Sequence, residues 1–184
     1  MMKTEQIKGN FFITGRQGSG KTTVGREMRR RGYSVFDIDH TAGLGKLREL
    51  ATGDLYDFAE ITLRSPNGLV DWNQYWFEVQ ADKLREVLDS GELVFVTGIA
   101  SNYADYLGLF DKVFVLIVDP EVARNRLVNH EHASHHLPSE IDRIMDGYDD
   151  KQRVLVESAD NTVSIDAGGS LDDIIKAIEG KIVS

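Results

Sequence analysis

Residues 15 to 22 read Gly15-Arg16-Gln17-Gly18-Ser19-Gly20-Lys21-Thr22, and they follow the apolar run Phe11-Phe12-Ile13. This is the spacing G-x-x-x-x-G-K-[ST], in which glycines let the backbone curl so that successive N–H groups point at phosphate oxygens. Lys21 adds a positive charge near the β- and γ-phosphates, and the Thr22 hydroxyl is placed to ligate Mg²⁺. A helix that starts here directs its free N–H groups at the same anion. The order of strand, loop, Lys-Thr pair and helix therefore predicts a site for nucleotide phosphates.

Length, charge and composition exclude several classes of protein. The chain has 184 residues, a formal net charge of -9 and no cysteine. The length suits one domain, residues 1–184, with its own hydrophobic core. Nucleic acid and anionic membranes are not expected as partners, because both bind clustered Lys and Arg. We expect a cytoplasmic protein, since disulfides are excluded, no cleavable apolar segment precedes the phosphate loop, and the longest apolar run, residues 113–118, cannot span a bilayer.

Short apolar segments alternate with helical patterns, which predicts a parallel sheet with helices on both faces. We expect strands at residues 10–14, 34–38, 93–97, 112–118 and 162–165, each rich in Val, Ile or Phe. We expect helices at residues 21–31, 75–90, 121–129, 139–157 and 171–181. Two stretches interrupt the pattern, residues 41–73 and residues 130–138. We interpret them as insertions on the ligand side of the sheet.

Two carboxylates follow the second expected strand. Asp37 and Asp39 are two residues apart, so in an extended segment both side chains face the same way, toward the Mg²⁺ expected beside Thr22. One carboxylate would hold the metal, and the other would accept a proton from a substrate hydroxyl. No acid follows the third strand, where Gly98 could let backbone approach a ligand and Asn102 could hydrogen-bond it. The alternative for this loop is a turn at Gly98 and a helix cap after it.

Aromatic and histidine clusters mark the ends of the two interruptions. Trp72, Tyr75 and Trp76 could stack against a ring-bearing substrate, or anchor the insertion to the core. Residues 130–136 contain four of the five histidines. Imidazoles can ligate zinc or nickel, but the segment lacks a helix-fixed spacing, and a polar flexible loop is the favoured interpretation.

The chain resembles the group of shikimate kinase, gluconate kinase and adenylate kinase, most strongly the shikimate-kinase-like branch. The resemblance is carried by Gly18-Ser19-Gly20-Lys21-Thr22-Thr23-Val24-Gly25, by Asp37-x-Asp39, by Asp119-Pro120-Glu121 with Arg126-Leu127, and by Ile165-Asp166. It implies a three-layer P-loop NTPase fold of class α/β, with a five-stranded parallel sheet in the order 2-3-1-4-5, a substrate-binding insertion at about 41–73 and a lid at about 130–138.

The same resemblance implies roles for individual residues. ATP would be bound by residues Gly15, Arg16, Gln17, Gly18, Ser19, Gly20, Lys21, Thr22 and Thr23, with Arg126 packed on the adenine and Ala167 and Gly168 beside it. Thr22 and Asp37 would hold Mg²⁺, and Asp39 would contact the substrate hydroxyl.

The chain also departs from the family pattern. A further lid arginine is usual about four residues beyond Arg126, and this chain has His130 there. A neutral imidazole stabilises developing charge less well than a guanidinium. Either another arginine, such as Arg16 or Arg143, supplies the charge, or turnover is slow. The triple glycine of shikimate kinases is also missing, so the chain is not expected to be a shikimate kinase itself.

Together these observations favour an ATP- and Mg²⁺-dependent kinase that phosphorylates a small-molecule hydroxyl. Lys21 and Asp39 would be catalytic, and Asp39, Gly98, Asn102 and Trp72 would bind the acceptor. A nucleoside monophosphate acceptor is less favoured, because residues 41–73 hold only two cations after Lys46, and phosphate recognition usually needs converging arginines. An ATP-binding regulator or slow ATPase is the rival hypothesis. The sequence carries no pattern that identifies the acceptor or decides between monomer and homodimer.

Overall fold

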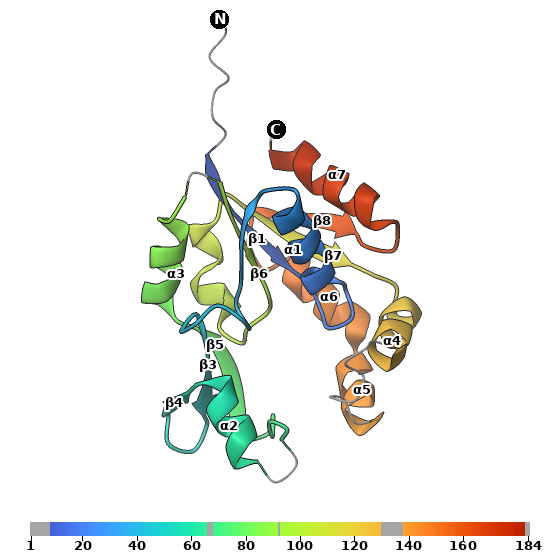
Figure 1. Cartoon of the computed structure of the whole chain (residues 1–184). Coiled ribbons are helices and arrows are strands. Elements are labelled where there is room, and N and C mark those ends of the chain that lie inside the picture. Colours follow the sequence, from blue (N-terminus) through green and yellow to red (C-terminus); the bar gives the residue numbers. More distant parts are fainter. Residues whose placement is uncertain (1–7, 66–67, 92, 130–137, 183–184) are drawn as a thin grey trace, which may run out of the picture.

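Five parallel strands form the central sheet of the molecule (Figure 1). The computed structural model describes residues 8–65, 68–91, 93–129 and 138–182. The strands are β1 (Gly9–Thr14), β2 (Ser34–Asp37), β6 (Leu93–Thr97), β7 (Lys112–Ile117) and β8 (Thr162–Asp166). Their spatial order is β2-β6-β1-β7-β8, which is 2-3-1-4-5 when only these strands are counted along the chain. The predicted fold class and strand order are confirmed.

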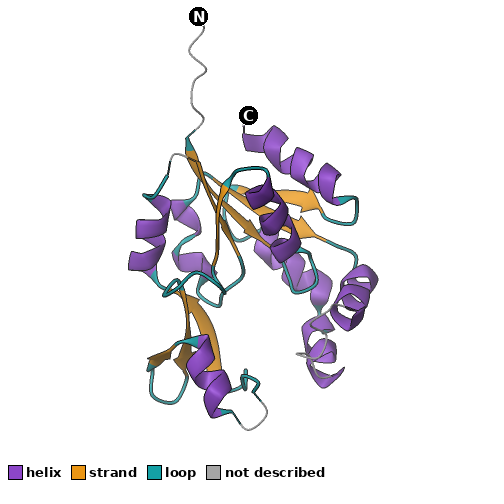
Figure 2. Ribbon diagram, in the orientation of Figure 1, coloured by secondary structure: helices purple, strands orange, loops and turns teal. Residues whose placement is uncertain are grey.

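Helices cover both faces of this sheet (Figure 2). On one face, α1 (Lys21–Arg30) and α7 (Leu171–Ile182) bury Met28, Ile175 and Ile178 against Phe11 and neighbouring side chains. On the other face, α3 (Ala81–Leu88) and α6 (Tyr148–Val156) bury Leu84, Val87 and Leu155 around Phe12. Successive residues of a strand point to opposite faces, so the central strand β1 supplies one phenylalanine to each core. This packing fixes the carboxyl end of β1, where the phosphate loop begins.

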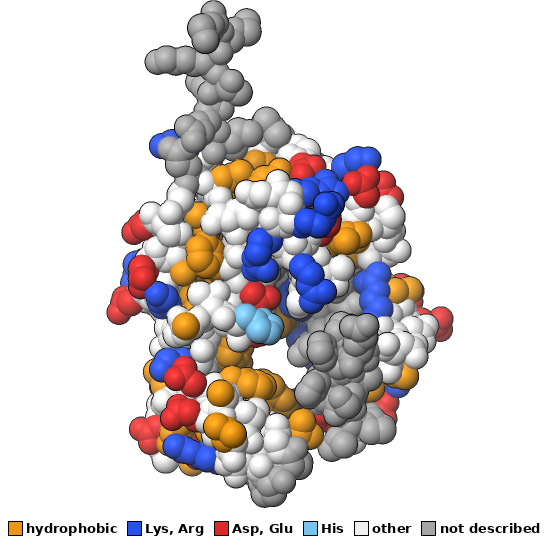
Figure 3. Space-filling model, viewed as in Figure 1, with side chains coloured by type: hydrophobic (Ala, Val, Ile, Leu, Met, Phe, Trp, Pro, Cys, Tyr) orange, Lys and Arg blue, Asp and Glu red, His pale blue; other side chains and the backbone are white. Residues whose placement is uncertain are grey.

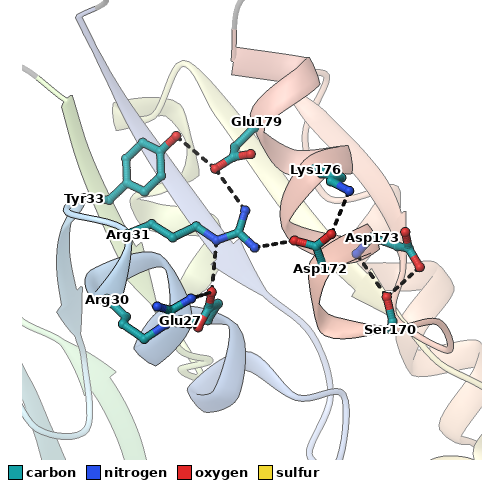
Figure 4. Close-up of polar contacts among 9 residues, drawn as sticks. All are labelled: Glu27, Arg30, Arg31, Tyr33, Ser170, Asp172, Asp173, Lys176 and Glu179. Carbon is teal, nitrogen blue, oxygen red and sulfur yellow. Dashed lines mark hydrogen bonds and ion pairs between the residues drawn. The ribbon is translucent and has the colours of Figure 1, made fainter.

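An ionic network ties α7 to α1, the helix that follows the phosphate loop (Figure 4). The Arg31 guanidinium lies 3.0 Å from Glu27 in α1 and 2.6 Å from Asp172 and 3.5 Å from Glu179 in α7. The Tyr33 hydroxyl also donates to Glu179. Single exposed ion pairs contribute little to stability, but one arginine that joins three carboxylates fixes how the two helices sit together.

The first interruption folds as a small antiparallel sheet of its own. Strands β3 (Gly45–Glu49), β4 (Leu55–Tyr56) and β5 (Tyr75–Val79) pair in the order β4-β3-β5, and α2 (Phe58–Arg64) packs on them through a core of Leu47, Ile61 and Val70. The helix expected over residues 75–90 is therefore wrong for residues 75–79. Their aromatic and β-branched side chains suit a strand, and β3 offers the partner. The insertion reaches Val79 rather than Asn73.

The second correction concerns the helix expected over residues 139–157. The structure has two helices, α5 (Pro138–Met145) and α6, because Gly147 adopts a left-handed conformation with φ 56°. Helices α4 (Pro120–Asn129), α5 and α6 share a separate hydrophobic cluster that includes Leu127, Ile144 and Tyr148. Residues 130–137 lie outside the described residues, and with them nearly all of the expected lid and the four clustered histidines.

Within the described part of the chain, no helix has the length and apolar character needed to cross a lipid bilayer.

Candidate functional site

The phosphate loop connects β1 to α1 and is packed against α4. A Cβ atom on Gly18 would lie 2.8 Å from the carbonyl oxygen of Ala123, and the backbone of Gly18 has φ 81°. Both the conformation and the close contact therefore require glycine at this position. The Lys21 ammonium group donates to the carbonyl oxygens of Gly15, at 2.7 Å, and Arg16, at 3.1 Å. The lysine thus folds over the loop that is expected to hold the phosphates.

The protein lowers the pKa of Lys21 to about 8. The largest cause is burial, because a charged ammonium group that loses its water is disfavoured. The carboxylates of Asp39 and Asp37 act in the opposite direction, and the Arg16 guanidinium adds to the lowering. These interactions place both acids and Arg16 close enough to Lys21 to act on its charge.

Four buried polar side-chain atoms lack a hydrogen-bond partner among the described residues. Three belong to the phosphate loop, namely Arg16 Nε, Gln17 Oε1 and Ser19 Oγ, and the fourth is the hydroxyl of Tyr106. An unsatisfied buried polar group costs roughly 1 to 3 kcal/mol, so such atoms usually bind water or a ligand. Their concentration in one loop makes that loop the candidate binding site.

The two predicted carboxylates lie at the end of β2 in different surroundings. Asp37 is held firmly: one oxygen accepts the Asp39 N–H at 2.9 Å and faces His40 Nδ1 at 3.0 Å, and the other accepts the Thr97 hydroxyl at 3.1 Å. Asp39 is exposed, and its carboxylate accepts no hydrogen bond from any described residue. Figure 3 shows acidic side chains (red) and a histidine (pale blue) together beside a hollow in this face.

The pKa of Asp39 is raised to about 6. Loss of surrounding water is the largest cause and the neighbouring Asp37 charge is the second, whereas Lys21 and then His40 oppose them. The carboxylate has accessible surface, but protein walls around it displace much of the bulk water. The arrangement gives two acids with distinct properties, one fixed by hydrogen bonds and one poised to exchange a proton near neutral pH.

Arg126 joins the phosphate loop to the loop after β8, where Ala167 and Gly168 were expected beside the adenine. From α4, its guanidinium donates to the carbonyl oxygens of Gly18 and Ser19 at 3.3 Å and to that of Ala167 at 3.0 Å. The N–H of Gly168 bonds to the carboxylate of Asp166, which shapes the loop between β8 and α7. The structure therefore brings Arg126, Ala167 and the phosphate loop together. Their contact with adenine stays a prediction.

Two acceptor residues predicted from the sequence have structural tasks. A Cβ atom on Gly98 would lie 2.1 Å from Cγ1 of Ile38, so the glycine makes room for a buried side chain between the two acids. The Asn102 amide accepts from the Val79 N–H at 2.9 Å and donates to its carbonyl at 3.1 Å, which links the loop after β6 to β5. Their acceptor-binding roles stay predictions.

The third, Trp72, lies in the insertion and is partly exposed. Its ring contacts Phe58 at 6.4 Å between centroids, and this is the ring contact it makes among the described residues. No ring contact among the described residues links Trp72 to Asp37 or Asp39. The role of Trp72 in binding an acceptor also stays a prediction.

Three side chains at the site were not found from the sequence. The Tyr148 hydroxyl donates to the Gln17 carbonyl at 2.8 Å and so docks α6 on the phosphate loop. Thr97 orients Asp37 through its hydroxyl. The pKa of the Tyr106 hydroxyl is raised chiefly by burial, and then by the charges of Asp105 and Asp39. The one available signal was the place of Thr97 at a strand end.

The oxygen donors at the site fit Mg²⁺. The exposed Thr22 hydroxyl and the carboxylates of Asp37 and Asp39 are hard ligands of the kind this ion prefers. Among the described residues, no three His, Asp or Glu side chains are grouped as a complete metal cage. Mg²⁺ in phosphoryl-transfer sites usually takes one or two protein ligands and completes its shell with water and phosphate, so the set suffices.

A parallel sheet in this strand order, with a glycine-rich phosphate loop between β1 and α1, defines the class of P-loop nucleotide-binding proteins. Residues 12–146 match the family described as "AAA domain", and the chain belongs to this family.

Known proteins resemble the chain at two levels. Shikimate kinase from Chromobacterium violaceum is 50% identical over 40 residues, which is 21% of this chain and 22% of that protein, so the match spans about a fifth of the relative. The structure of shikimate kinase from Bacteroides thetaiotaomicron superimposes with a TM-score of 0.60 at 20% identity, over 95% of this chain and 98% of that one. Deoxyadenosine kinase from M. mycoides with bound dATP gives a TM-score of 0.54 at 14% identity, over 95% and 100%. The fold is that of the P-loop small-molecule kinases.

Proposed function

We propose that the protein is an ATP-dependent phosphotransferase that transfers the γ-phosphoryl group to a hydroxyl of a small molecule. The observation that carries the proposal is Asp39, a carboxylate with a raised pKa that no described side chain or N–H satisfies, placed within electrostatic reach of Lys21. A carboxylate with a raised pKa that accepts no hydrogen bond from the protein is free to accept a proton from a substrate. A kinase needs a loop that binds the nucleotide phosphates and a residue near the γ-phosphate that accepts the proton of the substrate hydroxyl.

The residues divide the reaction between them. The acceptor oxygen forms a bond to the γ-phosphorus, the bond from that phosphorus to the β,γ-bridging oxygen breaks, and ADP leaves. The acceptor proton passes to Asp39, whose pKa of about 6 leaves it ionised at neutral pH yet basic enough to take the proton. Lys21 offsets charge on the phosphates. Mg²⁺, held with Thr22 and Asp37, would supply further charge neutralisation.

The insertion supports a hydroxyl acceptor over a phosphate acceptor. Its three cations are already paired: Lys46 with Asp57 at 3.6 Å, Arg48 with Glu78 at 2.8 Å, and Arg64 with Glu60 at 4.0 Å and over the ring of Tyr56. A second phosphate would have to break these pairs, whereas a hydroxyl compound would not. The shikimate kinase and deoxyadenosine kinase to which the chain is similar are small-molecule kinases by name, in line with this choice.

A screen for phosphoryl transfer tests the proposal. Purified protein, Mg²⁺ and γ-labelled ATP are incubated with pools of polyols, hydroxy acids, nucleosides and nucleoside monophosphates. We expect label on a hydroxyl compound, and we expect Lys21→Met to lose at least about a hundredfold in rate while its circular dichroism is unchanged. Lys83→Met, which removes a partly exposed lysine of α3 paired with Glu86, is the matched control and should transfer normally. Transfer at the wild-type rate by Lys21→Met would exclude this mechanism.

A second candidate is an ATP-binding regulator that hydrolyses ATP slowly or not at all. It is favoured by one observation, His130 at the position of the usual lid arginine. The same screen separates the two functions. Nucleotide binding without transfer to any pool would support the regulator.

A further inference from the structure

The loop that follows β6 is hydrogen-bonded to the small antiparallel sheet of the insertion. It bonds to β5, an end strand of that sheet whose one strand neighbour is β3. The N–H of Ser101 donates to the carbonyl oxygen of Phe77 at 2.7 Å. The Asn102 side chain accepts from the Val79 N–H at 2.9 Å and donates to the Val79 carbonyl oxygen at 3.1 Å. A single side-chain amide therefore bonds both backbone groups of one strand residue.

The other end of this loop lies at the two predicted carboxylates. The Thr97 hydroxyl donates to Asp37 at 3.1 Å, and the Thr97 carbonyl oxygen accepts the N–H of Ile38 at 2.9 Å. Residues 97–102 thus connect the segment that carries the two acids to β5 of the insertion. Because six residues span the whole distance, a movement of β5 at one end acts on the acids at the other.

The insertion can move as a unit on this connection. It has a hydrophobic core of its own, which includes Leu47 and Ile61, and Figure 1 shows its strands and α2 apart from the central sheet. Val79 is 4% exposed, so without the Asn102 amide its N–H and C=O would be buried without these partners. Unpaired buried backbone groups are unfavourable, and the strand would shift to satisfy them.

We propose that Asn102 is a positioning residue, whose amide holds the insertion in a fixed place relative to Asp37 and Asp39. Its consequence for phosphoryl transfer rests on the proposed function, in which the insertion lies on the acceptor side. A hydroxyl compound held by a displaced insertion would meet the γ-phosphate in a poor orientation, whereas ATP would bind the phosphate loop as before. A misplacement of about 1 Å can lower a transfer rate about a hundredfold.

Distance measurements by electron paramagnetic resonance test this role, because the chain has no cysteine of its own. One nitroxide label is attached to Leu63→Cys, on α2 of the insertion, and a second to Arg26→Cys, on α1 of the central domain; both positions are exposed. We expect one narrow distance distribution when Asn102 is present. Asn102→Ala in the doubly labelled protein should broaden or shift this distribution.

Asn161→Ala is the matched control. It also removes a partly buried amide with two backbone bonds, to the carbonyl oxygens of Leu107 and Phe110, and none of these residues belongs to the insertion. This variant should leave the distance distribution unchanged.

Kinetics of the cysteine-free proteins supply a second measurement. Asn102→Ala should bind Mg-ATP in calorimetry as the wild type does. Transfer to the hydroxyl compounds of the screen should fall on the order of tenfold to a hundredfold relative to transfer to water, because hydrolysis of ATP does not depend on where the insertion lies.

The outcomes separate this inference from the proposed function. A narrow, unshifted distribution in Asn102→Ala would overturn the positioning role and leave the kinase proposal intact. Equal broadening in Asn161→Ala would indicate general loosening and would also overturn the role. Since the distance measurement needs no acceptor, broadening specific to Asn102→Ala would support the role even if no pool were phosphorylated, a result that would overturn the kinase proposal alone.

A second variant keeps the test decisive if Asn102→Ala does not fold, as judged by circular dichroism. Asn102→Asp has the same shape and keeps an oxygen to accept from the Val79 N–H, but it cannot donate to the Val79 carbonyl oxygen. A broadened distribution in this variant supports the positioning role, and an unchanged one refutes it.

Discussion

The role proposed for Lys21 predicts that ATP affinity falls as pH rises through about 8, because only the protonated ammonium group would bind phosphate. The pKa of this ammonium group is lowered from 10.5 to about 8, chiefly by burial. If the neutral form does not bind, roughly nine-tenths of the protein is competent at pH 7 and roughly one-tenth at pH 9, so affinity should drop about tenfold over that range. A lysine with its ordinary pKa would lose only a few per cent.

Isothermal titration calorimetry measures this effect directly. ATP is titrated at saturating Mg²⁺ at pH 7, 8 and 9, in pairs of buffers with different ionisation enthalpies. The phosphates restore the proton on Lys21, so we expect about one proton taken up per ATP at pH 9 and about half a proton at pH 8. Asp39→Asn removes the carboxylate that most raises the pKa of Lys21, and the midpoint should therefore move to lower pH.

Two results would refute the reasoning. Constant affinity between pH 7 and pH 9 without proton uptake would mean that Lys21 is not partly neutral in the free protein. An equal fall in Lys21→Met, measured on its residual binding, would assign the pH dependence to another group.

Two further predictions concern the scaffold. Gly98→Ala should lower the free energy of unfolding in urea by about 3 kcal/mol, because the backbone of Gly98 has φ 148° and its Cβ would lie 2.1 Å from the buried side chain of Ile38. The control Gly108→Ala, whose Cβ would have no atom within 4 Å, should change it by no more than about 0.5 kcal/mol. Equal effects of the two substitutions would contradict the packing argument. Arg31→Gln should lower the melting temperature at pH 7, and the difference from wild type should shrink from pH 5 to pH 2.5. The pKa of Glu27 is lowered to about 2, first by its hydrogen bond to Arg30 and then by the one to Arg31. The Arg31–Glu27 ion pair therefore stabilises the fold fully above about pH 4.5, and this stabilisation is lost as the pH falls through about 2. A difference in melting temperature that does not change with pH would exclude this cause.

The central sheet could be predicted from the sequence because each strand, and the phosphate loop, is encoded by residues that are adjacent in the chain. Each strand is a short run of Val, Ile or Phe, and the phosphate loop is a contiguous motif. Asp37 and Asp39 were found from their place at a strand end, but the extended segment expected for them stops at Asp37, and Asp39 lies in the turn that follows β2. Strand order came from the resemblance, not from periodicity.

The failures came from partners distant along the chain. Residues 75–79 suit a strand as well as a helix until β3, about 30 residues earlier, is in place to pair with them. Tyr148 reaches the phosphate loop across more than 130 residues, and no local pattern announces such a contact. The raised pKa of Asp39 likewise depends on the walls around it, which exist only in the folded chain.

Ile38 stands between the two acids in the chain, is buried to 1% exposure, and fills the space that Gly98 leaves open. The positions of Asp37 and Asp39 therefore depend on how the side chain between them packs in the interior of the protein. Changes in the small antiparallel sheet would leave this contact intact, whereas a substitution at Ile38 or Gly98 would move the segment that carries both carboxylates.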